Sequence, residues 1–274
     1  MKRKLAAIGC LGLAPLFASH ITLAHDPVFG PGPHVLYKDG VEVHLGLDRN
    51  KAGGDKETEF DLELSYGLTG DWAAGLEVPY VRTEQGSDSA SGLGDARLFT
   101  KYRFWRHDTL GVQRSAAALL KVKLESGDER EDPPLGTGST DTLLGLTYGY
   151  ESLKWYRWAG MRYRRNGEND AGLQRGDKWL LDIVAGWRPR MPEYLRADTV
   201  WLLELNGEYG QRAEINGMTI RDTGGREWFV SPGIFWTRRN FAVKAGVQIP
   251  VASDLNGDQA ASDYRVRLTL EWHL

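Results

Sequence analysis

The sequence predicts an all-β fold, a transmembrane antiparallel up-and-down β-barrel of about twelve strands. Three observations support this prediction. Apolar and polar residues alternate along many short segments, as they do when the two faces of a strand meet different surroundings. Short and long connections alternate between these segments. Aromatic residues gather at the two ends of the segments, where a membrane barrel meets its two interfaces, and aliphatic residues fill the middles.

The clearest strand is the last one, where apolar residues from Tyr264 to Leu274 alternate with residues that include Arg265 and Arg267. A period of two puts every apolar side chain on one face, whereas a helix would spread the charges around its circumference. The same pattern recurs upstream and gives twelve strands in all. They cover residues 41–47, 60–68, 72–80, 96–104, 116–124, 142–150, 155–163, 179–187, 201–209, 228–236, 241–251 and 264–274.

The connections between these strands differ in length on the two sides of the expected membrane. Tight turns are predicted at residues 69–71, 107–109, 152–154 and 237–240. Long polar loops are predicted at residues 49–57, 82–92, 126–140, 164–176, 211–225 and 252–262. Short periplasmic turns and longer extracellular loops are typical of bacterial outer-membrane barrels. The sequence therefore predicts location in the cell outer membrane, with both chain termini in the periplasm.

The chain divides into three expected parts. Residues 1–24 have the layout of a secretory signal peptide, with three basic residues followed by an apolar stretch and a cleavage signal of small residues. Residues 25–40 are rich in Pro and Gly and are expected to form a periplasmic or lumen-plugging segment without regular structure. Residues 41–274 are expected to form the barrel.

Composition excludes several functional classes. Cys10 is the only cysteine and lies in the expected signal peptide, so a disulfide, a thiol nucleophile and a thiolate metal site are not expected in the mature chain. The net charge of -3 is small and indicates no nucleic-acid partner. No histidine falls in a predicted extracellular loop, which argues against an enzyme at the external lip, and no cofactor is predicted. A secreted β-sandwich or lipocalin-like barrel is the alternative fold, and it would bury the apolar strand faces inside.

If the apolar faces meet outer-membrane lipid, the opposite faces line the lumen. The first three strands then form an acidic arc, and the fourth and fifth strands form a basic arc. The predicted lumen-lining residues are Asp61, Glu63, Glu77, Arg97, Lys101, Arg103, Lys121, Lys123, Arg265 and Arg267. Two interpretations are open: a pore whose opposed arcs select small solutes, or a ladder of cross-strand ion pairs that only closes the barrel.

Some positions on the predicted inner face are apolar. They are Phe99, Trp105, Leu119, Leu143, Trp158, Val184, Leu202, Phe229 and Phe235. They would form a track for hydrophobic solutes or pack against an internal plug, for which residues 25–40 are the candidate. The same segment contains His25 and His34, which are candidate ligands of a soft divalent metal.

Four short motifs carry a resemblance to a known family. They are LEVPYVR at residues 76–82, GLGDAR at 92–97, KYR at 101–103 and GTGSTD at 136–141. In these motifs the chain resembles the outer-membrane β-barrel transporters named for the MetA-pathway of phenol degradation. The resemblance implies passive uptake or export of small compounds, including aromatic ones. The amino-terminal segment is similar to that of relatives linked to metal resistance, and no catalytic residue is carried over.

We therefore expect a channel or transporter for the passive passage of small solutes, including aromatic or hydrophobic ones. The expected partners are outer-membrane lipid, a small-molecule solute and the barrel assembly machinery, which would contact the carboxyl-terminal strand. Two alternatives remain open at this point. One is a metal-binding envelope protein linked to metal resistance, and the other is a structural barrel without an open pore.

Overall fold

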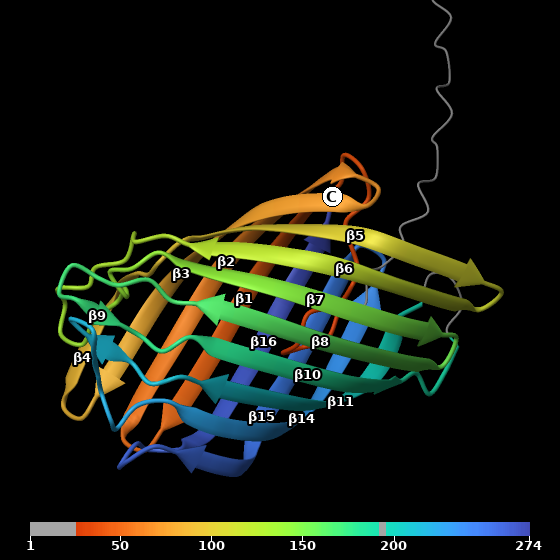
Figure 1. Ribbon diagram of the computed structural model, residues 1–274. Coiled ribbons are helices and arrows are strands. Elements are labelled where there is room, and N and C mark those ends of the chain that lie inside the picture. Colours follow the sequence, from red (N-terminus) through yellow and green to blue (C-terminus); the bar gives the residue numbers. More distant parts are fainter. Residues whose placement is uncertain (1–25, 192–195) are drawn as a thin grey trace, which may run out of the picture.

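The computed structural model describes residues 26–191 and 196–274. The expected signal peptide and His25 lie outside the described residues. Over the described ranges, twelve long antiparallel strands form a closed barrel (Figure 1). They are β1 (Val41–Ala52), β2 (Asp55–Thr69), β3 (Trp72–Gln85), β5 (Arg97–Thr109), β6 (Val112–Lys123), β7 (Asp141–Ser152), β8 (Trp155–Arg165), β10 (Lys178–Trp187), β11 (Asp198–Gly210), β14 (Gly225–Arg238), β15 (Phe241–Leu255) and β16 (Ser262–His273).

In the described part of the chain, four short strands lie outside this ring. β4 (Asp88–Leu93) pairs only with the extracellular half of β3. β9 (Leu173–Gln174), β12 (Glu214–Ile215) and β13 (Met218–Thr219) form a small sheet in the extracellular loops. Within the described residues there is no helix of the length and hydropathy needed to cross a membrane.

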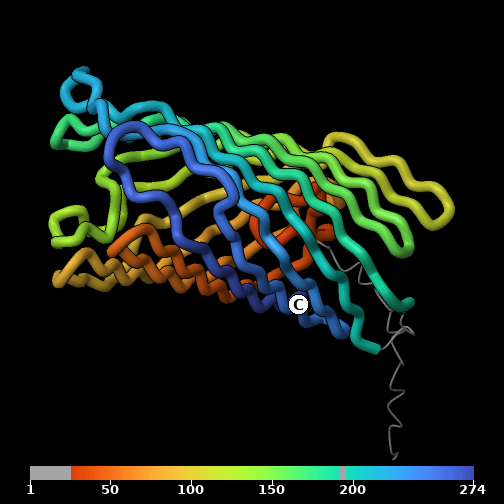
Figure 2. The backbone as a smooth tube through the Cα atoms, turned by 90° about the horizontal axis from the view of Figure 1, so that it is seen from below, coloured from red at the N-terminus to blue at the C-terminus, as the bar shows by residue number. Residues whose placement is uncertain are grey.

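The ring closes because the first barrel strand pairs with the last. β1 and β16 are antiparallel partners, with Val43 opposite Trp272, and each remaining barrel strand pairs with its neighbours in the chain. The smooth tube in Figure 2 follows this continuous wall. A closed ring leaves none of these strands with an unpaired edge, which hydrocarbon does not tolerate. The predicted all-β, twelve-stranded antiparallel barrel is confirmed.

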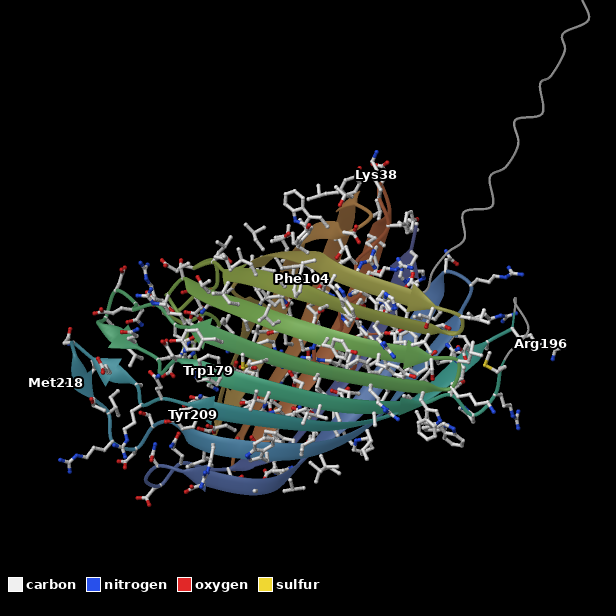
Figure 3. The ribbon with its side chains drawn as sticks, turned by 45° about the vertical axis from the view of Figure 1, so that its right-hand side comes forward. Lys38, Phe104, Trp179, Arg196, Tyr209 and Met218 are labelled. Carbon is white, nitrogen blue, oxygen red and sulfur yellow. The ribbon has the colours of Figure 1, made fainter. Side chains whose placement is uncertain are left out.

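The two faces of the wall have the predicted polarity. Leu62 and Ile183 on the outer face are 43% and 60% exposed, while Glu77 on the inner face is 6% exposed. Trp179 and Tyr209 project from the outer surface near the extracellular ends of β10 and β11 (Figure 3). An apolar exterior with charged groups inside is the reverse of a soluble sandwich, so the soluble alternative is wrong.

Several predicted loops and turns are parts of strands. The predicted loop at residues 49–57 is a continuation of β1 and β2 that turns at Gly53 and Gly54, and the predicted turn at 107–109 belongs to β5. The β5–β6 turn lies instead at Leu110 and Gly111, with Gly111 at φ 72°. Beyond the membrane both faces of a ribbon meet water, so alternation is lost although the backbone ladder continues.

Trp105 is the one predicted inward apolar residue that the structure contradicts. The register of β5 against β6 shifts between Arg103 and Trp105, which is the mark of a β-bulge. An extra residue in one strand reverses the facing of every side chain that follows it. Trp105 is consequently 42% exposed and stacks on Tyr148, which is also exposed.

Candidate functional site

The extracellular half of the lumen is hollow. A cavity of about 710 Å³ is lined mainly by charged residues of the barrel wall, and Phe29 of the amino-terminal segment borders it. Six of the ten predicted lumen-lining residues border this cavity: Glu77, Arg97, Lys121, Lys123, Arg265 and Arg267. Side chains two positions apart lie on the same face of a strand, and neighbouring strands keep their inward faces in register, so these six side chains border one space.

The predicted acidic and basic arcs are neighbours in the wall. Arg97 on β5 forms an ion pair of 2.6 Å with Glu59 on β2 and a second ion pair with Glu77 on β3. The ammonium group of Lys121 on β6 lies 2.6 Å from the other oxygen of Glu77. These arcs therefore neutralise each other along the wall, because β2, β3, β5 and β6 are consecutive, and they do not face each other across the lumen.

The other four predicted residues lie away from the cavity lining. Lys101 forms an ion pair of 3.0 Å with Asp26 of the amino-terminal segment. Arg103 binds Asp71 at 2.7 Å in the periplasmic β2–β3 turn. Glu63 lies 3.4 Å from the ring of His44, and Asp61 is half-buried on the same strand.

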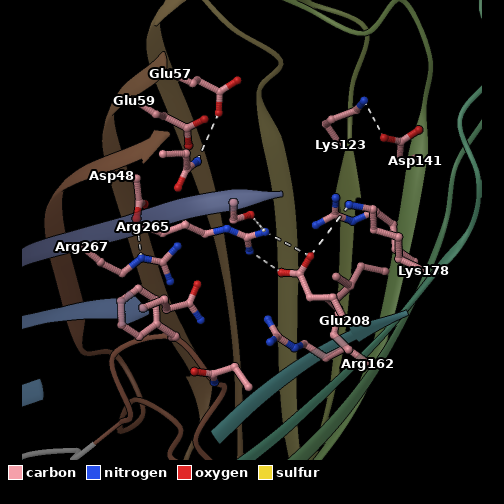
Figure 4. Close-up of a pocket in the computed structure, with 18 of the residues that line it drawn as sticks. Asp48, Glu57, Glu59, Lys123, Asp141, Arg162, Lys178, Glu208, Arg265 and Arg267 are labelled. Atoms are coloured by element: carbon pink, nitrogen blue, oxygen red, sulfur yellow. Dashed lines mark hydrogen bonds and ion pairs between the residues drawn. The ribbon is translucent and has the colours of Figure 1, made fainter. Parts of the chain in front are cut away.

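Further ion pairs line the rest of the cavity wall (Figure 4). Arg267 binds Asp48 at 2.7 Å, and Lys123 binds Asp141 at 2.6 Å. Arg265 on β16 forms an ion pair with Glu208 on β11. Glu208 was missed by the sequence reasoning, although alternation along residues 201–209 already puts it on the inward face.

The periplasmic half of the lumen is filled. Val28 is 4% exposed and belongs to a buried hydrophobic cluster that includes Trp158, Val200 and Phe235, and Phe29 packs against this cluster. Trp158, Val184, Leu202 and Phe235, four of the predicted inward apolar residues, are members of this cluster. The apolar inner wall is therefore in contact with residues of the amino-terminal segment.

Glu204 on β11 holds the backbone of this segment. Its carboxylate accepts N–H hydrogen bonds from Val28 at 2.6 Å, Phe29 at 3.2 Å and Gly30 at 3.1 Å, and Glu204 itself is 1% exposed. Hydrogen bonds to a charged group stabilise by about 1.5–3 kcal/mol each, and a buried carboxylate without such donors is costly. Glu204 is absent from the predicted lumen-lining residues, although alternation along residues 201–209 puts it on the inward face, and nothing in the sequence points to its partners.

Other parts of the wall also fit the segment. The hydroxyl of Thr147 donates to the carbonyl of Pro31 at 2.9 Å, and the guanidinium of Arg267 donates to the carbonyl of Val28 at 3.2 Å. Where the segment lies closest to the barrel wall, the wall residue is a glycine, which has no side chain to clash with it. A Cβ atom on Gly149 would lie 2.7 Å from the ring of Pro33, which is inside van der Waals contact. In Figure 1 the segment, in red, crosses the interior of the barrel.

His34 also binds the segment to the wall, through a hydrogen bond between its Nε2 atom and the carboxylate of Glu151 on β7. Burial lowers the pKa of His34, but attraction to Glu151 and the hydrogen bond outweigh it, so the pKa is raised above the ordinary histidine value. Among the residues that the structure describes, no group of three or more His, Cys, Asp and Glu side chains is placed to hold a metal ion. His25, the other predicted metal ligand, lies outside that range.

Comparison with known families gives a match over most of the barrel. The family model described as "Putative MetA-pathway of phenol degradation" matches residues 54–261. The chain belongs to this family. The resemblance seen in the four sequence motifs is thus confirmed. No curated protein matches the sequence.

Solved structures share the fold. The crystal structure of an outer membrane channel from Pseudomonas putida F1 is similar with a TM-score of 0.70 at 14% identity, covering 92% of this chain and 100% of that chain. The NanC porin is similar with a TM-score of 0.51 at 12% identity, covering 85% of this chain and 100% of that chain.

The closed barrel and its family place the protein in the outer membrane, among the barrel channels and porin-like proteins. The predicted localisation is confirmed. At such low identities the structural likeness concerns the fold alone, so the cargo must be argued from the residues of this chain.

Proposed function

We propose that this protein is a non-enzymatic channel for the passive passage of small solutes, and that residues 26–34 act as a plug that closes its periplasmic half. The observation that carries the proposal is the clamp of Glu204 on three consecutive backbone N–H groups of this segment. A buried carboxylate on the wall is thereby dedicated to a piece of chain that is not part of the wall.

The contacts that hold the plug differ from those that close the barrel. Barrel closure rests on continuous backbone ladders, including eleven paired positions between β1 and β16. The segment is held by the packing of Val28 and Phe29 and by five side chains of the wall: Glu204, Lys101, Thr147, Glu151 and Arg267. Each such contact contributes on the order of 1–3 kcal/mol, so the plug is displaced at a far smaller free-energy cost than the wall is opened.

The cavity above the plug suits a small solute with both polar and apolar parts. Its volume falls within the range of small-molecule pockets, roughly 300–1,000 Å³. Leu119, Leu143 and Phe29 line it together with the charged groups. This combination supports passage of small compounds with an aromatic or aliphatic body, in keeping with the family to which the chain belongs. The assembly machinery remains the proposed partner of strand β16.

Conductance in planar lipid bilayers tests this proposal. The mature full-length protein is expected to give rare, small current steps, because the plug fills the periplasmic half of the lumen. A variant that lacks residues 26–34 is expected to give larger and longer openings. If both proteins are silent although each migrates as a folded barrel, the interpretation as a structural barrel without a pore replaces the channel.

A further inference from the structure

Three cations gather on one part of the cavity wall, on strands β8 and β10. Arg162, Arg164 and Lys178 all line the cavity. The register places Arg164 directly opposite Lys178, and Arg162 directly opposite Leu180, which also lines the cavity. We call these three side chains the β8–β10 patch. Asp182 on β10 also lines the cavity and forms an ion pair of 2.7 Å with Arg162.

Apart from Asp182, the acidic groups that face the patch are Glu208 and Asp141, and both have other partners. Glu208 forms its ion pair with Arg265, and its distance of 3.9 Å to the ammonium group of Lys178 is too long for a hydrogen bond (Figure 4). Asp141 is paired with Lys123 at 2.6 Å. Neither carboxylate is therefore available to neutralise the patch fully.

The donors of the patch are incompletely used. Arg162 donates to Asp182 at 2.7 Å through one terminal nitrogen, but its Nε atom is buried and has no partner. The guanidinium of Arg164 forms no hydrogen bond or ion pair with any described residue. A guanidinium offers five N–H donors in a planar fork, and unpaired donors of this kind favour binding of a planar, bidentate anion.

An apolar surface adjoins the patch. Leu143 on β7 lies directly opposite Arg164, and Leu119 on β6 lies opposite Gly145, the next inward position along β7. Both leucines line the cavity. A ligand bound by its charged end to the β8–β10 patch would place its remaining atoms against these side chains.

We propose that the β8–β10 patch is a binding site for a small organic carboxylate with an apolar body, occupied as the solute enters from the extracellular side. The inference rests on the proposed channel function and adds the chemical class of the solute. The carboxylate receives N–H donors from Arg164 and Arg162 and the positive charge of Lys178. The apolar body is removed from water against Leu143 and Leu119, which favours aromatic or aliphatic acids over formate-sized anions.

Calorimetric titration of the mature full-length protein in detergent with benzoate tests the site, since it does not require an open pore. The double variant Arg164→Gln and Lys178→Gln is expected to bind benzoate at least tenfold more weakly. The matched control is Arg226→Gln, because Arg226 is an exposed cation on β14 that is 62% accessible and paired with Asp254. The control is expected to bind benzoate as the unmodified protein does.

Two further probes on the unmodified protein keep the test independent of how the double variant folds. Benzyl alcohol, which lacks the charge, and acetate, which lacks the ring, are both expected to bind at least tenfold more weakly than benzoate. Equal binding of benzoate and benzyl alcohol would overturn the role of the cations. Equal binding of benzoate and acetate would overturn the role of the apolar body.

The outcomes for site and channel are distinguishable. Benzoate binding that is lost in the double variant, together with silent bilayers, would retain the site and reject the channel. Conductance without benzoate binding would retain the channel and reject the site. Benzoate binding that is equal in the double variant and in Arg226→Gln would also reject the site.

Discussion

The two halves of the lumen are built on the same strands and have opposite contents. Below the middle of the barrel, inward positions of β8, β11 and β14 carry Trp158, Val200 and Phe235, which are 3%, 1% and 2% exposed. Above it, β8, β10 and β11 carry charged residues around a cavity. The wall has one architecture throughout, so the difference lies wholly in the residue types at every second position.

The comparison shows how one barrel combines a stable closure with a space for solute. Apolar inward residues alone would leave a dry void, and the amino-terminal segment fills that space with Val28 and Phe29. Charged inward residues cannot be covered in this way, because buried ions need partners or water. The boundary between the two halves therefore lies at Phe29, where the proposed solute would meet the proposed plug.

The largest predicted effect is a loss of stability when a buried side chain in the filled half of the lumen is truncated. Phe235→Ala should lower the free energy of unfolding by about 3–5 kcal/mol, because it removes a fully buried ring from a packed cluster. Leu143→Ala in the open half should cost only about 1 kcal/mol, since its side chain already borders a cavity. Denaturant titration of the protein in lipid vesicles measures both. Equal losses would show that the two halves do not differ in packing.

The second predicted effect is displacement of the plug when Glu204, which binds its backbone, is replaced. Glu204→Ala removes the acceptor of three backbone N–H groups and should raise the displaced population of the segment on the order of tenfold or more. A thiol at Val28→Cys reports this displacement by its labelling rate, because the mature chain is predicted to contain no cysteine. Glu208→Ala, in the open half, is the control and should leave the rate unchanged. An unchanged rate in Glu204→Ala would contradict the anchoring role.

The plug is also expected to respond to pH. Because the pKa of His34 is raised in the folded protein, its stabilising contact with Glu151 is fully present below the ordinary value of 6.5 and is lost as pH rises through the raised value. Labelling of Val28→Cys should therefore accelerate severalfold between pH 6 and pH 9, relative to a reference thiol at the exposed Ser87. In Glu151→Gln the acceleration should disappear. Its persistence would assign the pH response to another group.

The smallest effect is expected in the extracellular loop that follows β6. The Asp95 carboxylate accepts N–H bonds of 2.9 Å from both Gly127 and Thr137, and these bonds lower its pKa although burial acts to raise it. This contribution is present above the ordinary value of 3.8 and is lost as pH falls through the lowered value. Asp95→Asn should therefore speed tryptic cleavage after Arg130 severalfold at neutral pH. Cleavage after Arg221, in another loop, is the internal control, and an equal change at both sites would contradict a local role.

Alternation of residue types identifies the strands of the wall, and it misleads where the chain departs from a strict period of two. Leu62 and Glu63 are adjacent in sequence and lie on opposite faces of β2, because an apolar outer face and a charged inner face allow the strand only one register. Trp105 was misplaced because a bulge adds a residue without any signal in the alternation. The loop boundaries were also wrong, since ribbons in water need no alternation.

The sequence by itself determined a two-faced, twelve-stranded barrel with charged inward positions, because local alternation encodes which side of each strand meets hydrocarbon. Only the tertiary structure decided which of those charges neutralise each other and which, like Arg164, have no hydrogen bond or ion pair among the described residues. It alone brought Phe29 to Glu204, which are 175 positions apart in the sequence. The physical reason is that partners across a lumen depend on strand order, stagger and the path of the amino-terminal segment, and none of these leaves a periodic mark on the residues themselves.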